Sequence, residues 1–427
     1  MFCPLPNRRV LALAVLGIAL LAGVKPIFSQ TINPGYQPDY SQPATPLAPA
    51  DINNLPPVAA SPATTIPNSG AVAQAPVPAT PGNCPTCPVC QQFSLATTPN
   101  MIGDLPGGDD VYFDGRLPRA VNVGNLPIAG NDRRAKISED SSPIPTDRVF
   151  LDFNHFDSAA ETVDGHIIDM DRYTFGLEKT FFNGSCSIEV RAPIVRGLGS
   201  NETDPVSVDG NEGTVLGNVS ITPKYLFVKS DTWASSVGFT VNLPTAPNVS
   251  DTEIGYETTR VRNESVYLEP FLGLLLAPNN RIFSISYIQF DFDANGSPVT
   301  SQYFSGPIEA DGRFRDSALM HVDISAGYWL FDRREEFRAS SGLGGWISGI
   351  APIVELHYTT SLQSFSQHVA AITSDFARED VLDLTGGLDF LLGPLSNLTV
   401  AAAAPLRTSP RDRAFDAEVI VQFDQHF

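Results

Sequence analysis

The second part of the chain consists of short stretches in which apolar and polar residues alternate. Between Phe415 and Phe427 every odd position is apolar except Gln425, and every even position is polar except Ile420. A period of two is typical of a β-strand with one apolar and one polar face. Eleven earlier stretches show the same alternation, so the sequence predicts about twelve strands within 147–427.

The connections between these stretches differ in length. Short turns follow the second, fourth, sixth and tenth stretches, with the sequences FFNGS, KSDT, APNN and GPLS. The Asn183–Gly184 dipeptide in the first of them is a strong hairpin signal. Most connections after the odd-numbered stretches are long and polar. Two connections depart from this pattern: DRREEFRASSGLGG after the eighth stretch is too long for a turn, and RTSPRDR before the last stretch is only a modest loop. Short turns at one end and long loops at the other are typical of outer-membrane barrels.

These patterns predict an all-β fold, a closed antiparallel transmembrane β-barrel of about twelve strands. The apolar faces would then contact lipid, and the polar faces would line the lumen. A soluble β-sandwich also has alternating strands, and a polar face alone does not separate the two architectures. The apolar faces include Val149, Tyr173, Val219 and Val421, and also Phe283, Ile285 and Tyr287 in the seventh stretch, RIFSISYIQFDF.

The first 146 residues lack this alternation and divide by composition. Arg8 and Arg9 precede an uncharged apolar run too short to span a membrane, so residues 1–29 are predicted to be a secretory signal peptide. An uncleaved anchor helix is the alternative. Residues 30–100 are rich in Pro, Ala, Thr, Asn and Gln and are predicted to form a disordered periplasmic spacer. Residues 101–146 are interpreted as an irregular lead-in to the barrel or a plug.

The spacer carries the sequence CPTCPVC, in which Cys84, Cys87 and Cys90 are three residues apart. An exported protein meets an oxidising compartment, and three thiols leave one unpaired after a local disulfide forms. A structural zinc site needs four ligands, and neither a His nor a fourth Cys lies nearby. We therefore expect cross-links between chains, which would give homo-oligomers, or a local disulfide, ahead of metal or redox chemistry.

One stretch resembles a known family. The sequence LGNVSITPKYLFVKSDTWASSVGFTVNLPTAP is similar to the outer-membrane family named for the meta-pathway of phenol degradation. In that family one strand ends in Lys-Tyr and the next in Leu-Pro-Thr-Gly; Lys224–Tyr225 and Leu243–Thr245 match, while Ala246 replaces the glycine. The last hairpin of the same family resembles the stretches VAAAAPL and FDAEVIVQF. The start of the barrel in such proteins resembles KISEDSSPIPTDRVF. The resemblance implies a transport-related outer-membrane barrel, in which the terminal Phe427 is the recognition signal for the assembly machinery.

Composition and charge reduce the number of functions that the chain could have. The chain has 427 residues, with 47 Asp and Glu against 27 Lys and Arg, so its formal net charge is −20. An acidic chain without a basic stripe argues against nucleic acid as a partner. Charged residues on the polar faces of the strands would line the lumen of a barrel. These candidates are Arg172, Glu178, Glu189, Arg191, Lys224, Glu269, Asp323, Glu355 and His357.

Two motifs raise the question of further chemistry. The sequence DFDANG (Asp291–Gly296) matches the start of a calcium loop, but Gln302 stands where a bidentate Glu is needed. A strand running into an Asn-Gly turn is the simpler interpretation. Glu355 and His357 share one face, where an acid beside an imidazole could transfer protons. No Ser with a supporting motif accompanies them, so we expect no enzyme, no catalytic residue, no cofactor and no metal.

The sequence thus predicts an outer-membrane channel or carrier for small solutes. We expect it to be passive and weakly cation-preferring, because acids outnumber bases on the lumen faces. A structural or anchoring barrel without transport is the alternative, and a barrel hydrolase is a third hypothesis. The expected partners are outer-membrane lipid and the barrel assembly machinery, with the spacer on the periplasmic side.

Overall fold

The computed structural model describes residues 95, 98–104, 111–114, 120–122, 134–161, 167–196, 214–253, 257–303, 306–332, 347–363, 366–369, 372–375, 380–407 and 412–427. Twelve long antiparallel strands form one sheet that closes on itself. Their bounds are β3 (Arg148–Glu161), β4 (Ile167–Phe181), β5 (Cys186–Arg196), β7 (Val219–Lys229), β8 (Trp233–Leu243), β11 (Tyr267–Leu276), β12 (Ile282–Asp293), β15 (Leu319–Tyr328), β17 (Gly349–Ser361), β20 (Asp380–Leu391), β21 (Ser396–Pro405) and β22 (Ala417–His426). The predicted all-β closed barrel of twelve strands is therefore confirmed.

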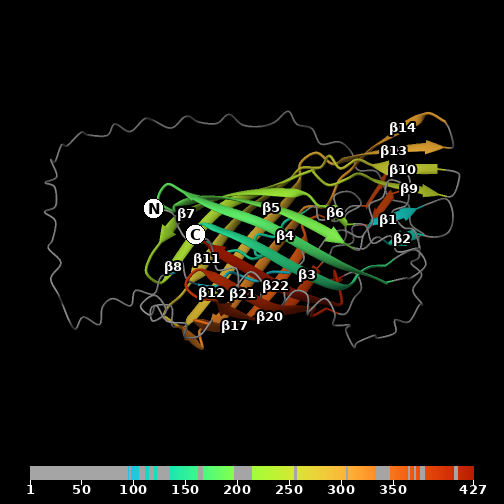
Figure 1. The fold of residues 1–427 in the computed structure, drawn as a ribbon. Helices are drawn as coiled ribbons and strands as arrows, with labels where there is room; N and C mark the ends of the chain where they lie inside the picture. Colours follow the sequence, from blue (N-terminus) through green and yellow to red (C-terminus); the bar gives the residue numbers. More distant parts are fainter. Residues whose placement is uncertain are drawn as a thin grey trace, which may run out of the picture. The chain divides into compact units, whose positions relative to one another are not determined.

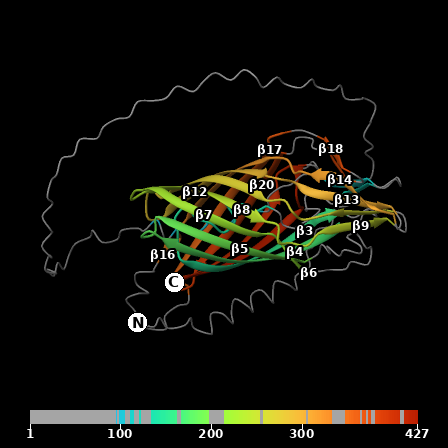
Figure 2. The same cartoon turned by 90° about the horizontal axis from the view of Figure 1, so that it is seen from above.

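The barrel closes where its first and last strands meet. Neighbouring barrel strands pair in chain order, β15 pairs with β17, and β22 pairs with both β21 and β3. At this seam Val421 lies opposite Phe153, and Gln425 lies opposite Val149. Figures 1 and 2 show the strands inclined across the barrel, as the closure of a twisted sheet requires.

The outer surface of the barrel is apolar. Large apolar side chains that are more than 40 % exposed recur along the strands; examples are Phe175, Ile188, Phe239, Leu272, Ile324, Val354 and Leu384. Such a band is a liability in water but matches the hydrocarbon of a membrane. Val149, Tyr173 and Val219 lie on this outward face, as predicted. Val421 also lies on it, although it is only 6 % exposed beside Phe153, its neighbour across the seam.

The apolar face assigned to the seventh stretch is the wrong face. In β12, Phe283, Ile285 and Tyr287 point inward and are at most 1 % exposed, whereas Ile282 and Ile288 are on the outer surface. Both faces of this strand carry large apolar residues, so alternation alone does not distinguish them. The inward set belongs to an apolar cluster in the barrel interior, which explains its direction.

The turn between β4 and β5 has the backbone conformation that its sequence predicts. Phe182, Asn183 and Gly184 have φ angles of 50°, 57° and 79°. These values lie in the left-handed region that Asn and Gly tolerate best, and such turns match the twist of the flanking strands. The Gly184 amide donates to the Phe181 carbonyl oxygen at 3.1 Å and closes the turn.

Short strands extend the long connections. One four-stranded sheet contains β9 (Val249–Glu253), β10 (Glu257–Val261), β13 (Ser297–Tyr303) and β14 (Ile308–Phe314). A second contains β1 (Val111–Asp114), β2 (Ala120–Asn122), β18 (Ser366–Val369) and β19 (Ile372–Asp375), while β6 (Thr214–Leu216) and β16 (Phe331–Asp332) add to the barrel sheet. Figure 1 shows β1, β2, β9, β10, β13 and β14 at one end of the barrel. No helix among the described residues is long and apolar enough to cross a membrane.

Candidate functional site

The barrel lumen contains part of the chain that precedes the first barrel strand. Residues 98–104 and 134–147, called the inner segment below, are joined by three backbone hydrogen bonds, one of which runs from the Asp140 amide to the Ile102 carbonyl oxygen (3.3 Å). The Met101 amide donates to the Ser141 carbonyl oxygen (2.9 Å), and the Ser141 amide donates to the Met101 carbonyl oxygen (3.3 Å). Leu95 is also buried and belongs to the apolar cluster of the barrel interior.

The inner segment supplies apolar side chains to the barrel interior. Met101, Ile102 and Ile137 belong to the same buried apolar cluster as Phe283 and Tyr287 of β12. Burial of such side chains against one another is the main favourable term in packing. The inner segment therefore acts as a core for the wall that surrounds it.

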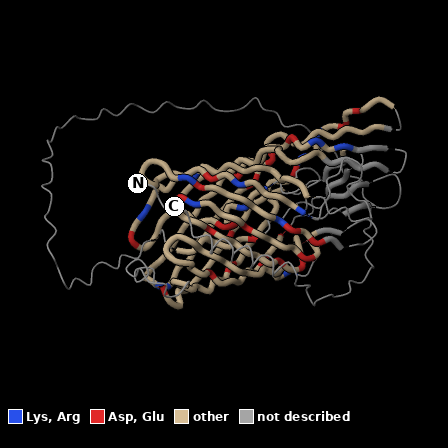
Figure 3. The backbone as a smooth tube through the Cα atoms, in the orientation of Figure 1, with Lys and Arg blue, Asp and Glu red and all other residues tan. Residues whose placement is uncertain are grey.

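Charged residues lie along the barrel strands as well as at their ends (Figure 3). Two regions of the lumen differ in their buried ion pairs. The first, called the arginine wall, is formed by the inward faces of β22, β3, β4, β5 and β7. Arg148 lies at its centre and is 1 % exposed. Its guanidinium nitrogens lie near carboxylate oxygens of Asp140 (2.7 Å), Glu178 (3.1 Å), Glu189 (2.9 Å) and Asp424 (2.6 Å). One side chain thus links four strands and the inner segment.

Further cations of the arginine wall also stand on its strands. Lys224 Nζ lies 3.2 Å from Glu178 Oε1 and donates to the Ser142 carbonyl oxygen at 2.8 Å. Arg191 Nε donates to Glu189 Oε1 at 2.5 Å. Hydrogen bonds between charged groups are stronger than those between neutral groups. Charged groups that are buried need such bonds to offset the loss of water. Glu178 and Glu189 of this wall are therefore paired with cations that stand on the barrel strands.

The second region, called the acidic wall, is formed by the inward faces of β12, β15, β17 and β20. Asp323, His357 and Asp383 lie opposite one another on β15, β17 and β20. His357 Nδ1 is 2.9 Å from Asp323 Oδ1, and Nε2 is 3.1 Å from Glu355 Oε2. An ionised carboxylate only accepts hydrogen bonds, so both ring nitrogens act as donors. This geometry favours the positively charged imidazole.

The inner segment provides the other cation of the acidic wall. Lys136 Nζ bonds to Asp104 of the same segment and lies 3.0 Å from Asp323 Oδ1. Burial by itself lowers the pKa of Lys136, but the Asp104 and Asp323 carboxylates more than offset this, so the pKa lies above its usual range. Asp104, Asp323 and His357 are close enough together to hold a metal ion. Such an ion would have to displace the Lys136 ammonium group, which bonds to both carboxylates.

A second link between the inner segment and the acidic wall uses the backbone. Glu355 Oε1 accepts from the Ile102 amide and Oε2 accepts from the Gly103 amide, both at 2.8 Å. Gly103 has a φ of 84°, and a Cβ there would lie 2.5 Å from Glu139 Cα, so this close approach requires glycine. From β22, Gln422 Nε2 donates to the Ile102 carbonyl oxygen at 2.7 Å.

The structure places the side chains of all nine predicted lumen residues in the buried interior of the barrel. Eight of them belong to the two walls, and one of these, Arg172 of β4, bonds to Glu139 of the inner segment. Glu269 accepts from Asn242 Nδ2 at 2.5 Å and from the Ala135 amide at 3.3 Å. Every member of the predicted set is therefore either a wall residue or a contact of the inner segment.

Sequence reasoning missed several residues that complete these networks: Asp104, Lys136, Asp140, Arg148, Asp383 and Asp424. Arg148, Asp383 and Asp424 share the inward parity of their strands, so the criterion that selected the nine candidates could have found them. Lys136 and Asp140 lie in KISEDSS, a short charged stretch just before the first strand. This cluster of charged residues was the signal in the sequence that could have identified Lys136 and Asp140.

Other predicted features lie outside the walls. Cys84, Cys87 and Cys90 fall outside the described residues. Phe427 is 60 % exposed, and its amide donates to the Asp147 carbonyl oxygen at 3.2 Å. Its role in assembly stays a prediction.

The DFDANG motif forms a turn. Asp293 Oδ1 accepts from the amides of Asn295 (3.2 Å) and Gly296 (2.7 Å), and Gly296 has a φ of 69°. An Asp that bonds to the following backbone amides is typical of an Asx turn. This geometry supports the simpler interpretation, a strand that runs into an Asn-Gly turn.

The acidic wall also contains a hydroxyl, an imidazole and a carboxylate in series. His321 Nδ1 is 2.8 Å from Thr359 Oγ1, and Nε2 is 2.9 Å from Asp291 Oδ2. This order is that of a nucleophilic triad. All three side chains are at most 2 % exposed, so the hydroxyl is not presented to a substrate. The group stabilises the wall by satisfying buried polar atoms.

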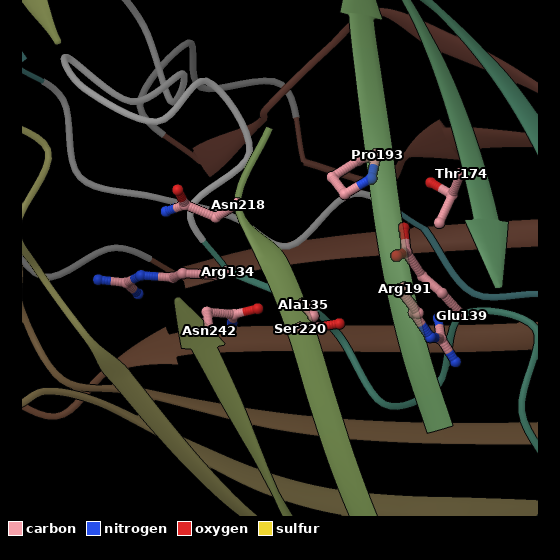
Figure 4. A pocket seen from close by; sticks show the side chains of 9 residues that line it. All are labelled: Arg134, Ala135, Glu139, Thr174, Arg191, Pro193, Asn218, Ser220 and Asn242. Atoms are coloured by element: carbon pink, nitrogen blue, oxygen red, sulfur yellow. The ribbon is translucent and has the colours of Figure 1, made fainter. Parts of the chain in front are cut away.

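A small pocket with a volume of about 10 Å³ lies between the inner segment and the neighbouring strands (Figure 4). It is lined by Arg134, Ala135, Glu139, Thr174, Arg191, Pro193, Asn218, Ser220 and Asn242. This volume is about that of one water molecule, and the lining carries charges of both signs, so the pocket suits water better than an organic ligand.

No family model and no curated protein matches the chain, so its membership of the predicted family stays a prediction. Among solved structures, an outer-membrane channel from Pseudomonas putida F1 aligns with a TM-score of 0.42 and 7 % identity, over 67 % of this chain and 97 % of its own. A deltaS2 mutant of the TodX monoaromatic hydrocarbon channel aligns with a TM-score of 0.39 and 10 % identity, over 77 % and 98 %. The NanC porin aligns with 0.37 and 9 %, over 65 % and 98 %. These likenesses are too distant to bear on substrate, and the barrel fold rests on the strand pairing of this chain.

Proposed function

We propose that the chain forms a passive, weakly cation-preferring channel or carrier for small solutes in the bacterial outer membrane. The observation that carries this proposal is a lumen lined by charged side chains inside a barrel whose outer surface is apolar. Burying charges is costly, and apolar side chains of similar volume often stabilise an interior as well or better. A charged interior is therefore better explained by contact with water and solutes than by stability alone.

The sign of the lumen charge supports a preference for cations. Among the buried residues of the twelve barrel strands there are eleven Asp and Glu but four Lys and Arg. The acids are Asp152, Glu178, Glu189, Glu269, Asp291, Asp323, Glu355, Asp383, Asp389, Glu418 and Asp424, and the bases are Arg148, Arg172, Arg191 and Lys224. An excess of carboxylates gives the lumen a negative potential, which attracts cations and repels anions.

A solute can pass through the lumen only if the inner segment moves aside. Its contacts with the walls are ion pairs and hydrogen bonds, such as Arg148 with Asp140 and Glu355 with the Ile102 amide. Contacts of this kind can break and re-form without covalent change. Because the segment continues directly into β3, it would remain tethered at the barrel wall after it moves.

The filled lumen also favours a second candidate, a structural or anchoring barrel without transport. In that case the inner segment is a permanent core, and the ion pairs serve only to fix its position. The two candidates differ in whether the inner segment moves far enough to admit water and ions.

Reconstitution of the purified, folded chain in planar bilayers decides between them. We expect a small conductance whose reversal potential indicates a preference for cations. The double variant E189Q/E355Q should weaken that preference because it removes two lumen charges. The matched control is E264Q, because Glu264 is exposed and pairs with Arg313 at 3.3 Å. A folded barrel that passes neither current in bilayers nor solute in liposome swelling would contradict transport and favour the structural candidate.

The predictions for the rest of the chain belong to the same proposal. The spacer lies in the periplasm, Cys84, Cys87 and Cys90 cross-link chains, and Phe427 is recognised by the assembly machinery. Non-reducing electrophoresis of the mature protein should show oligomers that disappear on reduction. A monomer under both conditions would leave only the intrachain disulfide.

A further inference from the structure

The acidic wall has more carboxyl groups than cations around it. The group consists of four carboxyls and two cations: Asp104, Asp323, Glu355 and Asp383 with Lys136 and His357. Asp383 is 1 % exposed, and neither of its carboxylate oxygens has a hydrogen-bond partner among the described residues. Its electrostatic neighbours are the Asp104 carboxyl and the cations Lys136 and His357. A buried carboxylate in this situation marks a position where a donor is missing.

The chemistry of the missing donor is indicated by the group that lies beside it. The Lys136 ammonium bonds to Asp104 and to Asp323, and its side chain is fully buried. A primary ammonium has three N–H donors and no acceptor, so it suits a position between several carboxylates. Lys136 comes from the inner segment, so this donor leaves the wall whenever the segment moves.

We propose that Asp323, Glu355, His357 and Asp383 form a binding site for the primary ammonium groups of small solutes, and that Lys136 occupies this site as a tethered substitute. The proposal rests on the proposed function, because solutes reach the site only through the lumen. When the inner segment moves, Asp323 loses its lysine and Glu355 loses two amide donors. An alkylammonium compound supplies N–H donors to Asp323 and Glu355 in their place, and it can also donate to Asp383.

The geometry fits an ammonium group better than a metal ion. Lys136 Nζ lies 3.0 Å from Asp323 Oδ1, so an ammonium group already donates to a carboxylate that a metal ion would need as a ligand. Both nitrogens of His357 face carboxylate oxygens, so a protonated ring has no lone pair for a metal.

The arginine wall does not lose its cations when the inner segment moves. Lys224 and Arg191 stand on β7 and β5, so they stay beside Glu178 and Glu189 when the inner segment moves. Only the acidic wall loses a cation to that movement. The ammonium site is therefore confined to one side of the lumen.

The test uses the full-length variant Lys136→Met, which removes the charge and keeps the length of the side chain. Its thermal unfolding midpoint should fall, and millimolar n-butylammonium or 1,4-diaminobutane should restore most of the loss. The wild type should not respond, because Lys136 already fills the site. Tetramethylammonium, which has no N–H, should not restore the midpoint. The matched control is Lys179→Met: Lys179 is half exposed and pairs with Asp147, so amines should have no effect.

Two further variants keep the test decisive. Adding D323N to Lys136→Met should abolish the effect of amines. D383N in the otherwise unchanged chain should leave the midpoint equal or higher, because it removes an unpaired charge; a clear drop would show that Asp383 has a donor and would overturn the site. A folded Lys136→Met barrel that responds to Zn²⁺ and not to amines would also overturn it, as would one that responds to neither.

The readout is stability and not current, so the site and the channel can fail separately. A barrel that binds amines but passes no current keeps the site and rejects transport. A conducting barrel in which Lys136→Met ignores amines rejects the site and keeps the channel.

Discussion

The arginine wall and the acidic wall are formed by the same kind of strand, but they neutralise their buried charges differently. On the arginine wall, Arg148 and Lys224 stand on strands beside the carboxylates that they pair with. On the acidic wall, Asp323 and Glu355 depend on Lys136 and on backbone amides of the inner segment. One side of the barrel can therefore keep its ion pairs alone, whereas the other needs the inner segment to complete them.

The inner segment is charged to match this difference. Its Glu139 and Asp140 bond to arginines of the arginine wall, and its Lys136 bonds to the acidic wall. The opposite orientation would bring like charges together in a medium of low dielectric constant, where repulsion is strong. The charge pattern thus selects one orientation of the segment in the lumen.

The largest expected effect comes from breaking the arginine wall at its centre. Arg148→Met would leave Asp140, Glu178, Glu189 and Asp424 without the cation they share. Removing one partner of a buried ion pair costs about 3–5 kcal/mol, so the barrel should lose at least that much stability or fail to fold. Urea unfolding and heat-dependent electrophoretic mobility measure this. Arg148→Lys should recover part of the loss, and an unchanged unfolding curve for Arg148→Met would show that the wall does not depend on this residue.

An intermediate effect is expected on the acidic wall. Glu355→Gln leaves one side-chain oxygen where two are needed, so the amides of Ile102 and Gly103 cannot both be satisfied. Losing a hydrogen bond to a charged group costs about 1.5–3 kcal/mol. Hydrogen exchange at Ile102 and Gly103 should accelerate accordingly, while E264Q should leave it unchanged. Equal exchange in Glu355→Gln and the wild type would mean that the inner segment is held by other contacts.

The smallest effect is expected for a similar ion pair outside both walls. Lys179 Nζ lies 2.8 Å from Asp147 Oδ2, and the two side chains are 50 % and 25 % exposed. Exposed pairs contribute about 1 kcal/mol or less, so Lys179→Ala should change the unfolding free energy by no more than that. A larger loss would show that exposure is not what separates this pair from the walls.

The same pair also has a pH dependence. Burial raises the pKa of Asp147, but hydrogen bonds from Lys179 and Thr180 more than offset this and the net shift is downward. A lowered carboxyl pKa stabilises the fold above the ordinary value, about 3.9 for Asp, and this contribution is lost as pH falls through the lower folded value. The difference between Lys179→Ala and the wild type should therefore shrink in acid. A difference that grows below pH 4 would contradict this assignment.

The barrel strands could be predicted because each has a period of two and is bounded by turn residues. The prediction failed for the face of β12, where Ile282 and Ile288 on one side are no more apolar than Phe283 and Tyr287 on the other. The short strands of the long connections could not be predicted, because they have only two to seven residues and are defined by pairing between distant loops, as in β1 with β19.

The contacts of the inner segment were also beyond prediction. The segment has no periodicity, and its partners are far away in the sequence: Ile102 and Glu355 are 253 residues apart. The alternation of polar and apolar positions assigned Glu355 and Asp323 to the lumen, but it does not predict which residues lie opposite them. Charge pairing across the lumen depends on three-dimensional closure, which local patterns do not contain.

The seam between β22 and β3 has a consequence for the order of assembly. Arg148 and Asp424 meet across it although they are 276 residues apart in the sequence, so this contact involves a very long loop closure. Until β22 joins β3, both β3 and β22 expose an unpaired edge to which another chain can add. The inner segment runs into β3 at Asp147, next to this last gap. The docking of β22 thus commits the chain to its own monomeric barrel and encloses the inner segment in the same step.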